Sequence, residues 1–183
     1  HSTKEQGRTY ALKVLAEGKT LTAVTTIPLY VPLTDYKWEE PPGTPNDTLA
    51  RLMVTINDPA EVHNYYRYFT SSDDEPLIPP FNSVTDDVLF DGKTFEFPLQ
   101  KAERRGGDFT PENFGLFKRE TKAIIKWCAI DKAHFDFWNT RDFAANSGGP
   151  FSTYTRISTN IQGGLGIWGG YAVGSDTLYV PPK

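Results

Sequence analysis

The chain has 183 residues, which is enough for one domain with its own hydrophobic core. Its 19 basic and 23 acidic residues give a formal charge of −4, and no basic stripe stands out. Proteins that bind nucleic acids concentrate positive charge on one face, so this class is excluded. The single cysteine, Cys128, excludes an internal disulfide and a multi-cysteine metal site, and its apolar neighbours predict a small buried side chain.

The composition predicts a β-rich fold. Only 38% of the residues are hydrophobic, but aromatic residues reach 14%, so few side chains can bury a large area. A single Met, 15 Gly and 14 Pro are typical of short strands joined by many turns and not of a helical bundle. We therefore expect an all-β domain with one short helix, either a two-sheet β-sandwich or, as the alternative, a closed β-barrel.

The first half of the chain alternates apolar and polar residues with the period of a strand. Residues 8–16 and 20–27 predict a hairpin, joined by a turn that contains a glycine. Residues 49–57 predict a further strand, and residues 63–71 predict another that is dense in aromatic side chains. A polar, Pro-rich loop is expected over residues 72–85.

The second half predicts another hairpin, a long loop and one buried strand. Residues 88–97 predict the hairpin, with its tight turn at Asp91-Gly92. Residues 101–121 are expected to be irregular and exposed, and residues 122–130 predict the most buried strand of the chain.

The only helix is expected immediately after this buried strand. Asp131 can cap a helix over residues 132–145, in which Phe135 and Trp138 share one face. Short strands are expected over residues 154–158 and 177–180.

A glycine-rich segment matches the residues of a nucleotide-binding pattern but not the structural context that the pattern requires. Residues 164–169 read G-x-G-x-x-G, but this fingerprint binds a dinucleotide only where it opens a helix after the first strand of a βαβ unit. The segment lies too near the C-terminal end for such a unit. We expect its glycines to permit a bulge or a close approach between strands, and we expect no nucleotide cofactor.

Metal-ligating residues do not show the spacing of a known site. The three histidines, His1, His63 and His134, are scattered. Acidic residues gather in two loops without the spacing of a known calcium loop. These residues are Asp73, Asp74, Glu75, Asp86, Asp87 and Asp91. We expect them to be solvated carboxylates, and we expect no metal.

No motif predicts catalysis. A G-x-S-x-G elbow does not occur, and Ser147 follows the expected helix and not a strand. A triad or a carboxylate pair can still assemble from distant residues, so a secreted hydrolase is kept as an alternative. The main expectation is a protein that binds and does not catalyse.

Four aromatic residues are candidates for contact with a ligand or a partner: Tyr65, Tyr66, Trp168 and Tyr171. Sugar rings stack on aromatic faces, and exposed aromatic patches usually have a function. The competing interpretation places these side chains in the core, because alternate side chains of a half-buried strand face inward. If they are exposed, a free-standing module that binds a small glycan or peptide becomes an alternative function.

Four parts of the chain, taken in order, carry a family resemblance. They are residues 7–14 with 22–28, residues 58–59 with 64–67, residues 130–138, and residues 160–171. With these segments the chain resembles the Bacteroidota outer-membrane lipoproteins that carry domain of unknown function 4249. The resemblance extends over nearly the whole chain, and residues 160–171 are its most specific part.

The resemblance implies a location, a partner and a domain organisation. It implies a lipid-anchored outer-membrane protein, on the cell surface or the periplasmic face, that assists a TonB-dependent transporter in substrate capture. Residues 1–28 would be the last hairpin of an immunoglobulin-like N-terminal domain, and residues 29–183 a C-terminal β domain. The lipid-bearing cysteine would belong to an N-terminal part missing from this sequence. No catalytic residue follows from the resemblance, and the loops over residues 72–85 and 101–121 are the expected contact surfaces.

Overall fold

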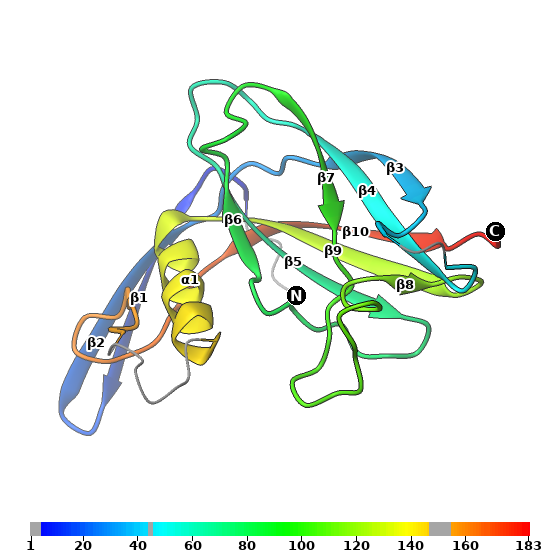
Figure 1. Ribbon diagram of the computed structural model, residues 1–183. Coiled ribbons are helices and arrows are strands. Elements are labelled where there is room, and N and C mark those ends of the chain that lie inside the picture. The colour runs from blue at the N-terminus through cyan, green and yellow to red at the C-terminus, as the bar shows by residue number, and fades with distance from the viewer. Residues whose placement is uncertain (1–4, 44–45, 147–154) are drawn as a thin grey trace.

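The computed structural model describes residues 5–43, 46–146 and 155–183 (Figure 1). These residues form ten strands and one helix. In chain order they are β1 (Thr9–Ala16), β2 (Lys19–Thr26), β3 (Leu33–Glu39), β4 (Leu49–Asn57), β5 (Tyr65–Ser72), β6 (Val84–Asp86), β7 (Thr94–Leu99), β8 (Phe117–Lys118), β9 (Lys122–Ile130), α1 (Lys132–Asn146) and β10 (Tyr171–Tyr179). The expected all-β class with one helix is confirmed.

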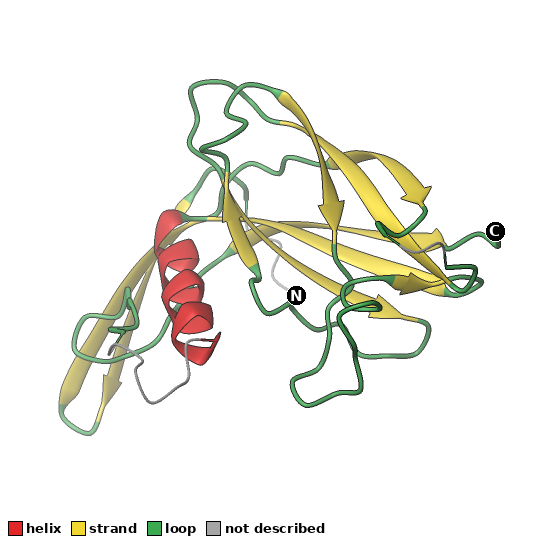
Figure 2. Ribbon diagram, viewed as in Figure 1, coloured by secondary structure: helices red, strands yellow, loops and turns green. Residues whose placement is uncertain are grey.

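Two antiparallel sheets form the body of the protein. One has the strand order β10-β9-β5-β6, and the other has the order β3-β4-β7, with β8 paired to the start of β4. The sheets lie against each other and do not close into a barrel (Figure 2). The sandwich is therefore the correct one of the two architectures that the sequence left open.

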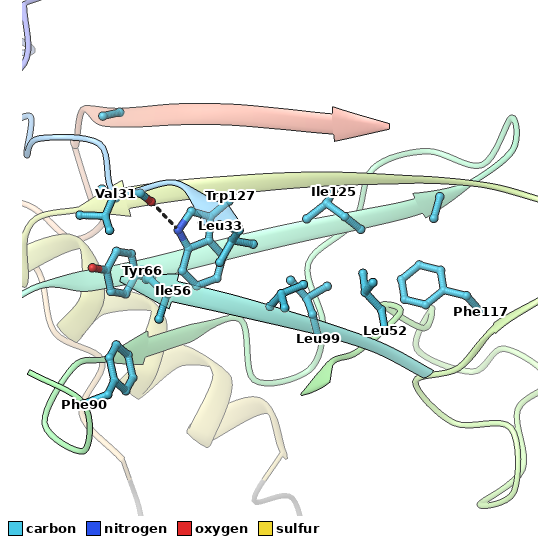
Figure 3. Close-up of a cluster of buried hydrophobic side chains, with 14 of the residues drawn as sticks. Val31, Leu33, Leu52, Ile56, Tyr66, Phe90, Leu99, Phe117, Ile125 and Trp127 are labelled. Carbon is cyan, nitrogen blue, oxygen red and sulfur yellow. Dashed lines mark hydrogen bonds between the residues drawn. The ribbon is translucent and has the colours of Figure 1, made fainter. Parts of the chain in front are cut away.

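The core lies between these two sheets (Figure 3). Trp127 of β9 is 1% exposed and stacks on Tyr66 of β5 at a centroid distance of 5.0 Å. Its indole Nε1 donates a 3.2 Å hydrogen bond to the carbonyl oxygen of Val31, so the polar atom of this large side chain is satisfied inside the core. The opposite sheet contributes aliphatic side chains such as Leu52 and Ile56, both 0% exposed.

The last residues of strand β9 are buried on both faces, and α1 packs on the neighbouring strands β5 and β6 of the same sheet. Residues on the inner face, such as Trp127, point into the core, while Cys128 on the other face is also buried. Phe135 and Trp138 of α1 lie against Tyr65 and Arg67 of β5, as their shared helix face predicts.

The first predicted hairpin is confirmed in its strands and its turn. Glu17 and Gly18 both have positive φ angles, 51° and 74°, as a tight hairpin turn requires. β1 and β2 form a separate two-stranded sheet that extends away from the sandwich (Figure 1). Gln162 of the glycine-rich segment pairs with Thr22 on the other edge of β2. The expected domain boundary at residue 28 stays a prediction.

The second predicted hairpin, over residues 88–97, is wrong. Residues 88–91 form a helical turn, in which Asp91 N–H donates to the carbonyl oxygen of Asp87 at 2.8 Å. β7 pairs instead with β4, and Leu99 lies opposite Leu52. The pairing with β4 buries Leu99, which is 1% exposed, and a local hairpin would not have done so.

Further predictions about strands need correction. β3 and β6 were not expected, and β8 interrupts the loop that was expected to be irregular throughout. β10 begins at Tyr171, six residues before the expected start at Thr177. In the predicted strand over residues 154–158, Tyr154 lies outside the described residues and residues 155–158 are not in a strand.

Candidate functional site

Two long loops meet to form a cleft of about 590 Å³ beside the end of β5. One loop follows β5, and the other connects β7 to β8 (Figure 1). These are the loops that the sequence predicted as contact surfaces. Five carboxylate side chains and three basic side chains line the cleft: Asp73, Asp74, Glu75, Glu103 and Asp108, with Lys101, Arg104 and Lys118.

Three phenylalanine side chains pack together and join the two loops. Phe81 comes from the first loop, and Phe109 and Phe114 come from the second, with ring centroids 5.4 to 5.8 Å apart. The guanidinium of Arg105 lies 5.1 Å from the Phe81 ring and donates a 2.7 Å hydrogen bond to Asn146 Oδ1 at the end of α1. The cleft is therefore a preformed feature attached to the helix.

Some charged side chains of the cleft form ion pairs or hydrogen bonds that hold its loops in place. Lys101 Nζ lies 3.3 Å from Glu103 Oε2 and 3.6 Å from Glu75 Oε2, so it links the two loops. Asp73 Oδ1 accepts a 2.8 Å hydrogen bond from Lys122 N–H and fixes the turn after β5. Among the described residues, four exposed charged side chains of the cleft have no ion-pair partner: Asp74, Arg104, Asp108 and Lys118. These free charges remain to meet a polar ligand or a partner protein.

Tyr65 lines a second depression, where the hairpin joins the sandwich. This groove has a volume of about 330 Å³, and Leu29 and Val62 are exposed at its wall, at 68% and 53%. The Tyr65 ring packs on Phe135 at 5.0 Å, and desolvation raises its pKa. The groove is apolar, in contrast to the charged cleft.

Tyr171 is exposed on the outer face of the same sheet, at 42%. Lys126 Nζ lies 5.0 Å from the Tyr171 ring centroid and 5.1 Å from that of Phe69, and it donates a 3.3 Å hydrogen bond to Tyr171 Oη. The three side chains form an aromatic–cation–aromatic stack on the sheet surface. Tyr65 and Tyr171 both pair with Ile130, one on each side of β9, but α1 starts between them.

Trp168 is half-buried in the glycine-rich segment. Its backbone N–H donates to Asn160 Oδ1 at 3.0 Å, and its carbonyl oxygen accepts from Asn160 Nδ2 at 2.7 Å. A Cβ at Gly169 would lie 2.6 Å from His134 Nδ1, and one at Gly170 would lie 2.6 Å from Ile27 Cγ1. Within the predicted segment, Gly169 thus approaches the helix α1 and not a strand as expected, while a Cβ at Gly164 would lie 3.3 Å from Leu21 Cδ2 of β2.

Tyr66 needs a correction, because it does not lie on a surface. Its side chain is 0% exposed, and its hydroxyl donates a 2.7 Å hydrogen bond to Asp58 Oδ1. It belongs to the core, as the competing interpretation held. The four candidate aromatic residues therefore do not form one site.

Cys128 of β9 and His134 of α1 are both buried. Burial raises the pKa of the Cys128 thiol to about 11, which keeps it protonated and unreactive at neutral pH. The expectation of a small buried side chain is confirmed. Desolvation and the nearby Arg67 lower the pKa of His134 to about 4, so this imidazole is neutral.

The environment of Asp87 also differs from the one that the sequence predicted. It was predicted as a solvated loop carboxylate, but it is 0% exposed. Its neighbours in space include Asp58 and Asp91. Asp58 was not among the residues that the sequence singled out for metal binding, because it lies on a different connection of the chain.

The fold and the loop cleft together define a β-sandwich protein with one packed helix and a charged, preformed surface cleft. The sequence profile of a family described as domain of unknown function 4249 matches residues 2–177, so the chain belongs to this family. No curated protein and no solved structure matches the chain. In the part of the chain that the structure describes, no helix has the length and apolar character needed to cross a bilayer. The organism group, the lipid anchor and the transporter partner stay predictions.

Proposed function

We propose that this protein is a non-catalytic, lipid-anchored subunit of the Bacteroidota outer membrane that docks on a TonB-dependent transporter and helps it to capture its substrate. The location and the partner rest on the family resemblance. The observation that carries the binding role is the cleft between the two long loops, which the cluster of Phe81, Phe109 and Phe114 holds together.

The cleft is suited to binding because it is assembled before a partner arrives. Loops that are already ordered lose less conformational entropy on association, so more of the contact energy contributes to affinity. The free charges at Asp74 and Arg104 provide electrostatic complementarity with a polar partner, and such charges determine specificity and association rate more than affinity.

The test is a pull-down of the tagged, full-length protein from detergent-solubilised outer membranes of its own bacterium, followed by mass spectrometry. We expect a TonB-dependent barrel in stoichiometric amounts. A double variant, Asp74→Lys with Arg104→Glu, reverses two of the free charges of the cleft and should reduce the recovered barrel. Glu17→Lys, in the exposed turn between β1 and β2, is the control and should leave recovery unchanged.

A pull-down that yields the protein alone would contradict the transporter role. Equal recovery with the cleft variant and with wild type would show that the partner binds elsewhere. In that case the loops would lose their role, while the transporter association would stand.

A free-standing module for glycans or peptides is the second candidate, and the stack of Phe69, Lys126 and Tyr171 favours it. An exposed aromatic face next to a cation can stack on a sugar ring and donate a hydrogen bond to its hydroxyls. Tyr171→Ala should abolish binding on a glycan or peptide array. Tyr179→Ala, on the same strand and 60% exposed, should not. Unchanged binding by Tyr171→Ala would remove this candidate.

A further inference from the structure

Three carboxylates from two separate connections of the chain meet beside the core. Asp58 follows β4, while Asp87 and Asp91 begin and end the turn between β6 and β7. One oxygen from each of the three lies within 4.8 Å of the other two. The helical turn brings Asp87 and Asp91 to the same side, because Phe90 N–H and Asp91 N–H both donate to the carbonyl oxygen of Asp87, at 2.7 and 2.8 Å.

Asp87 is the member of this acidic cluster that most needs a partner. Its side chain is 0% exposed, and its Oδ2 accepts a 2.6 Å hydrogen bond from Asn64 N–H. Its Oδ1 is also buried and accepts no hydrogen bond. His63 Nδ1 lies 3.2 Å from this oxygen but is not placed to donate to it. A buried carboxylate oxygen without a partner is costly, and such atoms are rare in folded proteins.

Asp58 is held in position as a ligand would be. It is 7% exposed; Tyr66 Oη donates to its Oδ1 at 2.7 Å, and Gly92 N–H donates to its Oδ2 at 3.3 Å. Neutral hydrogen bonds orient the carboxylate without cancelling its charge. Among the described residues, no Lys or Arg pairs with any of the three carboxylates. Clustered negative charge of this kind is stabilised when a cation lies between the carboxylates.

We propose that Asp58, Asp87 and Asp91 bind a divalent cation, and that this cation is Ca²⁺. The donors are all oxygen atoms. Hard cations such as Ca²⁺ and Mg²⁺ prefer oxygen ligands, whereas nitrogen and sulfur ligands suit transition metals. Ca²⁺ binds oxygens at about 2.3 to 2.6 Å, so two oxygens on opposite sides of the ion lie about 5 Å apart. The three carboxylate oxygens lie within 4.8 Å of one another, so one Ca²⁺ can contact all of them. Asp91 is exposed, which leaves solvent access for the waters that would complete the coordination. Ca²⁺ is preferred over Mg²⁺ because Mg²⁺ demands near-ideal octahedral geometry.

The proposed ion would join two connections of the sandwich. It would tie the turn between β6 and β7 to the connection between β4 and β5, which also supplies His63 and Val62 to the apolar groove at Tyr65. Ca²⁺ should therefore stabilise the fold and order one wall of that groove.

The test uses the protein after treatment with a chelator and its removal. Tb³⁺ is the probe, because excitation of Tyr66, whose hydroxyl contacts Asp58, can sensitise Tb³⁺ bound in the cluster. We expect saturable Tb³⁺ luminescence that Ca²⁺ displaces at lower concentrations than Mg²⁺ does. We also expect the midpoint of thermal unfolding to rise as Ca²⁺ is added.

Asp91→Asn is the informative variant, because Asp91 is exposed and its replacement leaves the buried residues in place. It should weaken Tb³⁺ and Ca²⁺ binding roughly tenfold or more and reduce the rise in the unfolding midpoint, since ligand charge tunes calcium affinity. Asp74→Asn removes the same charge from the loop cleft and should bind as wild type does. No saturable binding up to about 1 mM Ca²⁺, or equal binding by the two variants, would overturn the proposal.

Discussion

Thr25 Oγ1 donates a 2.6 Å hydrogen bond to Asp131 Oδ2, and this contact links the projecting hairpin to the start of α1. The same oxygen accepts from Thr26 N–H at 2.9 Å, while Asp131 Oδ1 caps the helix by accepting from His134 N–H at 2.9 Å. One carboxylate therefore fixes β2, the end of β9 and the helix relative to one another.

Replacing Asp131 should destabilise the protein more than replacing a half-buried residue usually does. Asp131→Ala removes a helix cap, which costs about 1 kcal/mol, and leaves Thr25, which is 3% exposed, without its acceptor. We expect a total loss of about 2 to 4 kcal/mol in the free energy of unfolding, measured by urea denaturation. Asp136→Ala on the same helix removes only an ion pair with Lys132 and should cost about 0.5 kcal/mol or less. Similar losses for both variants would show that Asp131 has no linking role.

Buried His134 should make stability depend on pH. Its pKa is lowered from 6.5 to about 4, chiefly by desolvation and then by Arg67 of β5, while Asp131 opposes the shift and Tyr171 contributes a ring contact at 6.2 Å. The unfolded chain binds a proton on this histidine more readily than the folded protein does. The contribution of His134 is therefore fully present above pH 6.5 and is lost as the pH falls toward 4, by about 3 kcal/mol in total.

The measurement for His134 is urea denaturation at a series of pH values from 7 down to 4. His134→Gln cannot titrate, so the variant should show a smaller fall in stability over this range than wild type. Parallel profiles for wild type and His134→Gln would contradict the prediction.

The parts of the fold that sequence predicts correctly are those determined by neighbouring residues. Alternation over residues 8–27, the apolar run at residues 122–130 and the Asp131 cap each act within one element, and each is present. β3 was missed because Pro28 and Pro32 precede it and because a bulge with positive φ at Asp35 breaks its alternation. β7 was assigned to the wrong partner because the Asp-Gly turn signal is local, whereas burial of Leu99 against β4 is not.

In the candidate sites, too, the features set by neighbouring residues were predicted and those set by the tertiary fold were not. The two loops were predicted as contact surfaces from their length, but the contact between Phe81 and Phe109 that joins them depends on the tertiary fold. Asp87 was expected in solvent because loops are usually exposed, and its burial beside Asp58 carries no local signal. Tyr66 could not be separated from Tyr65 by pattern alone, because which face of a strand points inward depends on the partner sheet.

Tyr66→Phe tests the assignment of Tyr66 to the core. The variant keeps the ring that stacks on Trp127 but leaves Asp58 Oδ1 without its 2.7 Å donor. We expect a loss of about 1 to 3 kcal/mol in the free energy of unfolding, because a buried carboxylate loses a hydrogen bond. Tyr179→Phe, which alters an exposed hydroxyl, should change the stability by less than about 0.5 kcal/mol. Equal stability of Tyr66→Phe and wild type would show that the Asp58 contact contributes nothing.

The phenylalanine cluster should control how often the loop between β7 and β8 opens. Phe114 contacts both Phe81 and Phe109, and each such aromatic pair contributes about 0.5 to 1.5 kcal/mol. Phe114→Ala should therefore lower the free energy of local opening by about 1 to 3 kcal/mol, and trypsin should cleave after Arg104 and Arg105 roughly 10 to 100 times faster. Phe143→Ala, on an exposed face of α1, is the control and should leave the cleavage rate near that of wild type. Unchanged cleavage in Phe114→Ala would mean that other contacts, such as the ion pairs of Lys101, hold the cleft closed on their own.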